Sequence, residues 1–159
     1  MAFLEWLSNT AFPTWVRESE TVWAYPFVLF LHSLGMAMLV GFISVIDVKL
    51  LGVRRLPLAS LQRLMPIIWA GFWINAVTGV LLLVIAPDKL RNPVFWVKLT
   101  LIALGMINLL FITRDVFGQP IPDNKPFSGR VKFLGATSLV VWMGAITAGR
   151  LMAYIGNTR

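Results

Sequence analysis

The chain has 159 residues, a formal net charge of +7 and no cysteine. Hydrophobic residues make up 58% of it and charged residues 13%, and the mean hydropathy is +0.78, which together exclude an ordinary soluble globular protein. The absence of cysteine excludes disulfides, zinc–thiolate sites and iron–sulfur clusters. The basic residues lie in short connections between apolar runs, a pattern that indicates membrane topology and lipid headgroups rather than nucleic acid.

The N-terminal segment, residues 1–20, is predicted to form a short helix lying at the membrane interface. Its apolar face would consist of Phe3, Leu4, Trp6 and Leu7. Pro13 is expected to break this helix, because proline lacks a backbone donor and fixes φ.

Long uncharged runs then predict membrane-spanning helices. Thr21–Ile46 and Leu64–Pro87 contain no charged residue, and each exceeds the roughly 20 apolar residues that cross a bilayer. The runs are continuous rather than alternating, which favours helices over barrel strands. We predict an all-α, integral membrane four-helix bundle that forms one membrane domain over residues 1–159. Its spans are expected at about residues 22–48, 64–86, 94–113 and 131–154.

Lysine and arginine are distributed unevenly over the connections, eight against six, and this bias predicts the orientation. We expect the first and third connections to be cytoplasmic and both termini to lie outside. The cytoplasmic set is Lys49, Arg54, Arg55, Arg63, Arg114, Lys125, Arg130 and Lys132, and the outer set is Arg17, Lys89, Arg91, Lys98, Arg150 and Arg159.

Small residues recur every four positions within the predicted spans. Gly71, Asn75 and Gly79 form one such stripe, and Ala145 with Gly149 belongs to another. Small side chains let helix backbones approach closely in lipid. The stripes predict helix packing within one bundle, with a self-association face as the less favoured alternative.

His32 is the only histidine of the chain and lies within the first predicted span. Lys98 and Arg150 each lie four residues from the outer end of their spans, so they share a depth about 9 Å outward of His32 at the helical rise. Cations within the hydrocarbon face the protein interior or snorkel to the interface, and both alternatives stay open for these two.

The three basic residues together suggest a site for haem b. Imidazole is a common axial ligand of haem iron, so His32 would bind the metal while Lys98 and Arg150 held the propionates. Gly35 lies one turn from His32 and would leave room either for the flat macrocycle or for a neighbouring helix. Met106 and Met143 lie near the depth of His32, and each could supply a thioether ligand or simply fill the core.

The polar residues of the spans also allow an interpretation in which no cofactor binds. His32 could form hydrogen bonds within the bundle, to Ser138, Asn75 or Thr78. Asn75 and Asn108 are expected to make interhelical hydrogen bonds.

Two further groups of residues in the spans have expected roles. Asp47 is expected in an ion pair with Lys49 or Arg54 rather than in a proton relay. Trp69, Trp73 and Trp142 lie too deep for the interfacial aromatic belt, and we expect them to fill the core or line a pocket.

Three stretches carry a resemblance to known families. Leu31–Gly52, Asn92–Phe111 and Trp142–Tyr154 resemble an uncharacterised family of small bacterial four-span membrane proteins, defined by a domain of unknown function, which implies the bacterial cytoplasmic membrane. His32 and Lys98 more remotely resemble the membrane-bound haem-containing protoporphyrinogen oxidase and copper-resistance D families. That likeness implies haem at His32 and Lys98, although the further histidines of those families are missing here.

Two functions from different classes follow from these observations. The first is a small haem-b-binding membrane protein or subunit that transfers electrons to or from a membrane protein partner. The alternative is a cofactor-free accessory or scaffold subunit of a larger or homo-oligomeric complex. A transporter is less favoured because the polar residues are too sparse for a pathway. No enzyme motif is present, so the chain is not expected to be an enzyme on its own.

Overall fold

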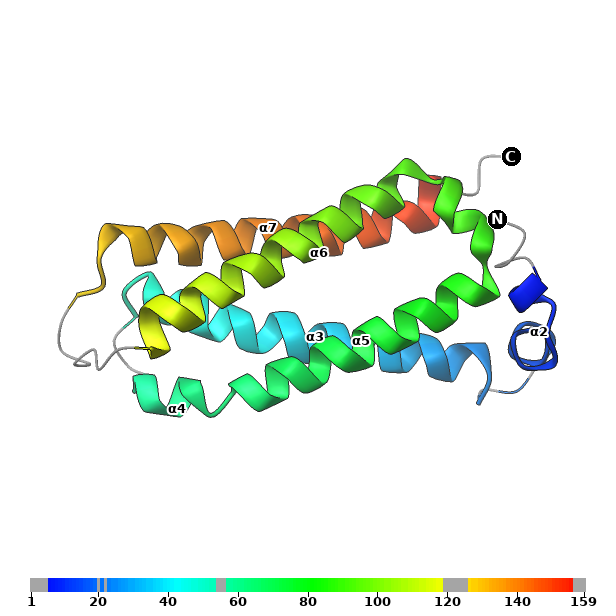
Figure 1. Ribbon diagram of the computed structural model, residues 1–159, viewed down its shortest axis with the longest axis horizontal. Helices are drawn as coiled ribbons and strands as arrows, with labels where there is room; N and C mark the ends of the chain where they lie inside the picture. Colours follow the sequence, from blue (N-terminus) through cyan, green and yellow to red (C-terminus); the bar gives the residue numbers. More distant parts are fainter. Residues whose placement is uncertain (1–5, 20, 22, 54–56, 119–125, 156–159) are drawn as a thin grey trace.

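The computed structural model confirms an all-α architecture with four long helices (Figure 1). It describes residues 6–19, 21, 23–53, 57–118 and 126–155, and Phe3 and Leu4 of the predicted interfacial helix lie outside this part. The α-helices are α2 (Ala11–Glu18), α3 (Tyr25–Leu50), α4 (Leu58–Gln62), α5 (Met65–Ile85), α6 (Pro93–Ile112) and α7 (Gly129–Ile155). A 3₁₀-helix, η1 (Pro87–Arg91), and a π-helix, η2 (Thr113–Phe117), adjoin α6 at its two ends.

The long helices begin where the sequence allows a helix to begin. Pro26, Pro66 and Pro93 all lie in first turns, where the missing backbone donor removes no helical hydrogen bond. Asn92 caps α6, because its side chain accepts a hydrogen bond from the Val94 N–H at 2.9 Å. Pro13 also lies in a first turn, that of α2, so it does not break a helix as expected. The helical residues that precede α2 end earlier, at Ser8.

Four helical segments are long and apolar enough to cross a membrane, as expected for a multi-pass membrane protein in a lipid environment. They include α3, α5 extended by α4, α6 extended by η2, and α7. The predicted spans agree with these helices to within a few residues at most ends. The largest differences are that the second segment already begins at Leu58, with α4, and that the third continues beyond residue 113 as far as Phe117.

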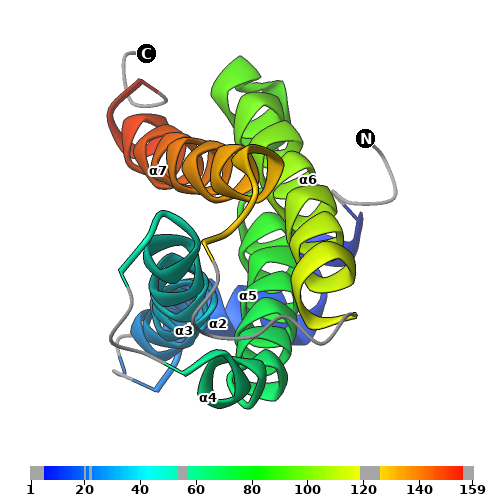
Figure 2. The same ribbon diagram turned by 90° about the vertical axis from the view of Figure 1, so that its left-hand side faces the viewer.

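The four long helices form two hairpins, α3 with α5 and α6 with α7, which lie one above the other when viewed end-on (Figure 2). The hairpins meet mainly through α3 and α7. These two helices lie together at the end of the bundle that carries α4 and separate towards the end that carries α2 (Figure 1). We call these the α4 end and the α2 end.

The hydrophobic core occupies the half of the bundle at the α4 end. It contains the last three turns of α3, the end of α6 and the indole of Trp142, which is 1% exposed. The buried members are Leu39, Val40, Ile43, Ile46, Leu50, Leu58, Leu61, Ile68, Leu109, Ile112, Val116, Val131, Trp142 and Ala145. No residue before Leu39 on α3 and none before Leu109 on α6 is a buried member of this core, so the half at the α2 end is packed differently.

Glycines bring the helices close in both hairpins. A Cβ atom on Gly71 would lie 2.8 Å from the Leu39 backbone nitrogen, so α3 and α5 are in direct backbone contact there. On α7, Gly144 lies under the side chain of Leu101. The stripes of small residues thus serve packing within one bundle, as predicted.

Candidate functional site in the half at the α2 end

His32 is held against α5 by two residues of that helix. Its Nδ1 atom lies 3.1 Å from the backbone oxygen of Asn75 and 3.1 Å from the Thr78 hydroxyl. In return, the Asn75 side-chain amide donates a hydrogen bond to the His32 backbone oxygen at 2.8 Å. The interhelical bonds expected of His32 with Asn75 and Thr78 are therefore present, whereas Ser138 is not a partner of this imidazole.

These bonds determine which nitrogen of the ring carries the proton. A carbonyl oxygen only accepts, so Nδ1 must donate to Asn75. The Thr78 hydroxyl donates to the Ile74 backbone oxygen at 2.6 Å, so it too can accept from Nδ1–H. In the neutral imidazole, Nε2 is then the atom with the free lone pair.

The Nε2 atom remains available to a ligand. It has no hydrogen-bond partner among the described residues, and it is not one of the fully buried polar atoms that lack a partner. Gly79 lets the ring lie this close to α5, because a Cβ atom there would be 3.3 Å from His32 Cε1. The stripe of Gly71, Asn75 and Gly79 on α5 thus makes room for the histidine ring as well as for the neighbouring helix α3.

Lys98 lies on α6, across the separation between the two hairpins. Its side chain lies over Gly149 of α7, where an added Cβ would be 3.6 Å from Nζ. Lys98 makes no ion pair with any described residue. Both Lys98 and Lys89, a residue of η1, lie within electrostatic range of the His32 imidazole. Three basic groups therefore gather in the half of the bundle that lacks the hydrophobic core.

Arg150 follows Gly149 directly, so it does share the level of Lys98, but its side chain is exposed. Lys89 occupies the position nearer to His32 and was not predicted from the sequence. The sequence signal for Lys89 was its place in the short connection between the end of α5 and the start of α6, the same end of α6 that carries Lys98.

Gly35 belongs to a helix crossing rather than to an open space. A Cβ atom there would lie 2.7 Å from the Asn75 backbone nitrogen and 2.9 Å from the Gly71 oxygen. The backbone of α5 occupies the side of α3 that was considered for a macrocycle. Of the two interpretations of Gly35, the neighbouring helix is correct.

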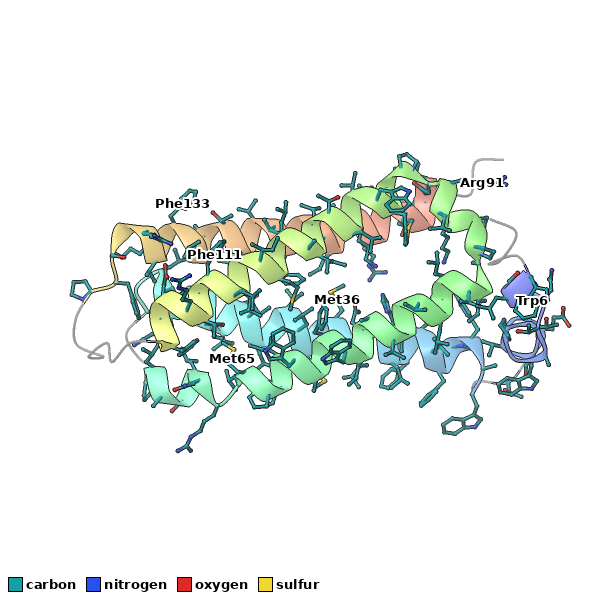
Figure 3. All side chains as sticks on the ribbon, viewed as in Figure 1. Trp6, Met36, Met65, Arg91, Phe111 and Phe133 are labelled. Atoms are coloured by element: carbon teal, nitrogen blue, oxygen red, sulfur yellow. The ribbon has the colours of Figure 1, made fainter. Side chains whose placement is uncertain are left out.

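The two candidate methionines differ in their surroundings. Met106 is partly buried and packs against the core. Met143 is 64% exposed because Trp142, one residue earlier, takes the inward face of α7, and successive helical residues point about 100° apart. A third methionine, Met36, lies one turn from His32 and between the two hairpins (Figure 3), and it was not predicted as a ligand.

No family model, curated protein or solved structure matches this chain. The resemblances drawn from short stretches of sequence therefore remain predictions. The geometry of the site around His32 is the evidence that bears on the function.

Proposed function

We propose that the chain is a membrane haem-b protein or subunit that transfers electrons, with His32 as an axial ligand of the iron. The observation that carries this proposal is the bonding of the imidazole. A histidine that ligates a metal through one nitrogen usually donates its other N–H to a carbonyl or carboxylate, which fixes the ring and raises its basicity. His32 has this arrangement, with Nδ1–H on Asn75 and Thr78 and Nε2 free.

The surrounding charge supports an anionic ligand. Lys98 and Lys89 lie near His32, and Lys98 has no acidic partner among the described residues. An unpaired cation between apolar helices is unfavourable, and a bound carboxylate would relieve it. Lys98 and Lys89 are the groups that would hold the propionates. Arg150 is exposed and would bind a propionate only from the surface of the bundle.

The packing of the bundle supports a bulky apolar ligand. The hairpins are joined by the hydrophobic core at the α4 end, but this core does not extend to the level of His32. A haem bound there would bury apolar surface of both hairpins. Met106 is the one of the two predicted thioether ligands that lies inside the bundle.

The chain has one histidine, so two imidazoles from a single copy cannot ligate one iron. Met106, water or a group from a second subunit would provide any further ligand beside His32. Electron transfer is the role proposed for such a centre, since haem supplies one-electron chemistry and a partner would supply or accept the electron.

Absorption of the protein purified in detergent tests the proposal. We expect a Soret band in the wild type or after addition of haemin, and loss of that band in His32→Ala. Ser33→Ala is the matched control, because Ser33 is the next residue and bonds only within its own helix, to the Leu29 backbone oxygen. A colourless wild-type protein that does not take up haemin would refute the proposal.

The alternative is a cofactor-free accessory subunit, and one observation favours it. Trp73 lies in the middle of α5 with 61% of its surface exposed, although a deep tryptophan was expected inside the bundle. A large aromatic ring on the outer face suits contact with a partner helix. Under this alternative, Trp73→Ala would abolish co-purification with a partner, whereas His32→Ala would leave it intact.

A further inference from the structure

A second polar site lies in the other half of the bundle, within the hydrophobic core. Asp47 is 0% exposed, and neither of its carboxyl oxygens has a hydrogen-bond partner. The expected ion pair is absent among the described residues: Asp47 is not bonded to Lys49, and Arg54 lies outside the described part.

Two further polar groups, both on α7, are buried in this half of the bundle. Ser138 is 1% exposed and its hydroxyl faces the Asp47 carboxyl without reaching hydrogen-bond geometry. The indole N–H of Trp142, one turn further along α7, is also buried without a partner. Gly135 brings α7 against α3 at this level, because a Cβ atom there would lie 3.3 Å from the Asp47 backbone oxygen. The Asp47 carboxyl and the Ser138 hydroxyl are thus buried next to each other. The unpartnered indole N–H lies one turn further along α7, where it faces Gly105 of α6.

Among the described residues, no positive charge compensates a carboxylate at this position. Neither α4 nor α5 contains a charged residue. Arg130 and Lys132 on α7 are exposed, and Arg130 pairs with Asp115 of η2 at 3.1 Å. Arg114 of η2 and Arg63 after α4 are exposed as well. Lys49, although buried, lies two residues along α3 and so points about 200° away from Asp47 around the helix.

The helix itself also disfavours a negative charge. Asp47 lies in the last turn of α3, where the helix dipole places partial negative charge and favours cations. A sodium ion would need more oxygen ligands than Asp47 and Ser138 supply, since the backbone oxygens nearby are engaged in helices. A proton needs only one oxygen.

We propose that Asp47 is an intramembrane proton-binding site, holding one proton at neutral pH next to Ser138, with water completing their hydrogen bonds. The carboxylic acid O–H then donates to the Ser138 hydroxyl or to that water. This site is independent of His32, from which it is separated by about four helical turns of α3.

Infrared spectroscopy of the protein in lipid nanodiscs tests this proposal directly. We expect the carbonyl band of a protonated carboxylic acid at neutral pH, sensitive to ¹³C-aspartate labelling and absent in Asp47→Asn. Asp88→Asn, at an exposed aspartate of η1, is the matched control and should retain the band. Ser138→Ala should shift the frequency because it removes the hydroxyl partner. A wild type without this band, or one that loses it when sodium replaces choline, would overturn the proposal.

Thermal unfolding provides a second measurement that does not depend on the band. A native state that binds more protons than the unfolded chain loses stability as the pH rises. The unfolding temperature of the wild type should therefore fall as the pH rises from about 4, where aspartate in an unfolded chain ionises, through neutral pH. Asp47→Asn should lose this dependence without being less stable at neutral pH. Destabilisation of Asp47→Asn at neutral pH would instead show that the carboxylate is needed.

Discussion

The two halves of the bundle are built from the same helices but are held together in different ways. At the α4 end, α3 and α7 meet around a hydrophobic core that includes Trp142, Ile43 and Ile112. At the α2 end, the hairpins separate (Figure 1), and Lys98 of α6 and Lys89 of η1 lie within electrostatic range of His32 on α3. If the proposed function is correct, the half at the α4 end stabilises the bundle and the half at the α2 end binds the ligand. Substitutions in each half should therefore affect different measurements.

The largest expected effect on stability comes from the half with the core. Trp142→Ala should lower the free energy of unfolding by about 3–5 kcal/mol, because the side chain is 1% exposed and its removal leaves a large cavity. Trp73→Ala is the matched control, with a side chain that is 61% exposed on α5. Reversible unfolding in mixed detergent micelles measures both. Equal losses for the two tryptophans would contradict the assigned core.

A smaller loss is expected at the crossing of α3 and α5. Gly35→Ala places a methyl group 2.7 Å from the Asn75 nitrogen and should cost about 1–3 kcal/mol as the helices move apart. Gly41→Ala, on the same helix with no atom within 4 Å of the new Cβ, should be neutral or slightly stabilising. The Gly35 substitution should also weaken haemin binding, since it displaces the helix that holds His32. A Gly35→Ala protein as stable as Gly41→Ala would refute the close crossing.

The two buried asparagines should have similar, moderate effects on stability but different effects on the ligand. Asn75 and Asn108 each donate one interhelical hydrogen bond to a backbone oxygen, at 2.8 and 2.9 Å. Replacement by alanine should cost about 0.6–1.7 kcal/mol in each case, the range for hydrogen bonds between membrane helices. Only Asn75→Ala should reduce haemin affinity, because only Asn75 holds the backbone of His32. A loss of affinity in Asn108→Ala of equal size would remove the distinction between the halves.

The smallest effect is expected at the surface ion pair of the α4 end. Arg130 and Asp115 lie 3.1 Å apart, but Arg130 is 71% exposed. Arg130→Gln should therefore change stability by less than about 1 kcal/mol, and less still at high salt. Measurement at two salt concentrations checks this, and a larger, salt-independent loss would show that the pair matters for the core beneath it.

The sequence predicted the helices well because the length of an uncharged run is a one-dimensional property. Counting depth along the helices also brought His32 and Lys98 to neighbouring levels, and the structure places them within electrostatic range. Depth does not give the rotation of a helix about its axis. Met143 and Trp73 have suitable depths, yet both point outward.

The remaining differences arise from packing between segments that are distant in sequence. Gly35 faces α5 because Gly71 lies opposite, and no local pattern in α3 reveals this. Asp47 was expected to pair with the basic residues that follow it in the chain, whereas the structure surrounds it with the core and Ser138. The tautomer of His32 follows only from its contacts with Asn75 and Thr78.

Rescue of a cavity variant by free imidazole tests the central claim most directly. In His32→Gly, haemin should no longer give the wild-type Soret band, and added imidazole should restore it by occupying the place of the side chain next to Asn75 and Thr78. Ser33→Gly should bind haemin like the wild type without added imidazole. A His32→Gly protein that retains the wild-type spectrum on its own would contradict ligation by His32.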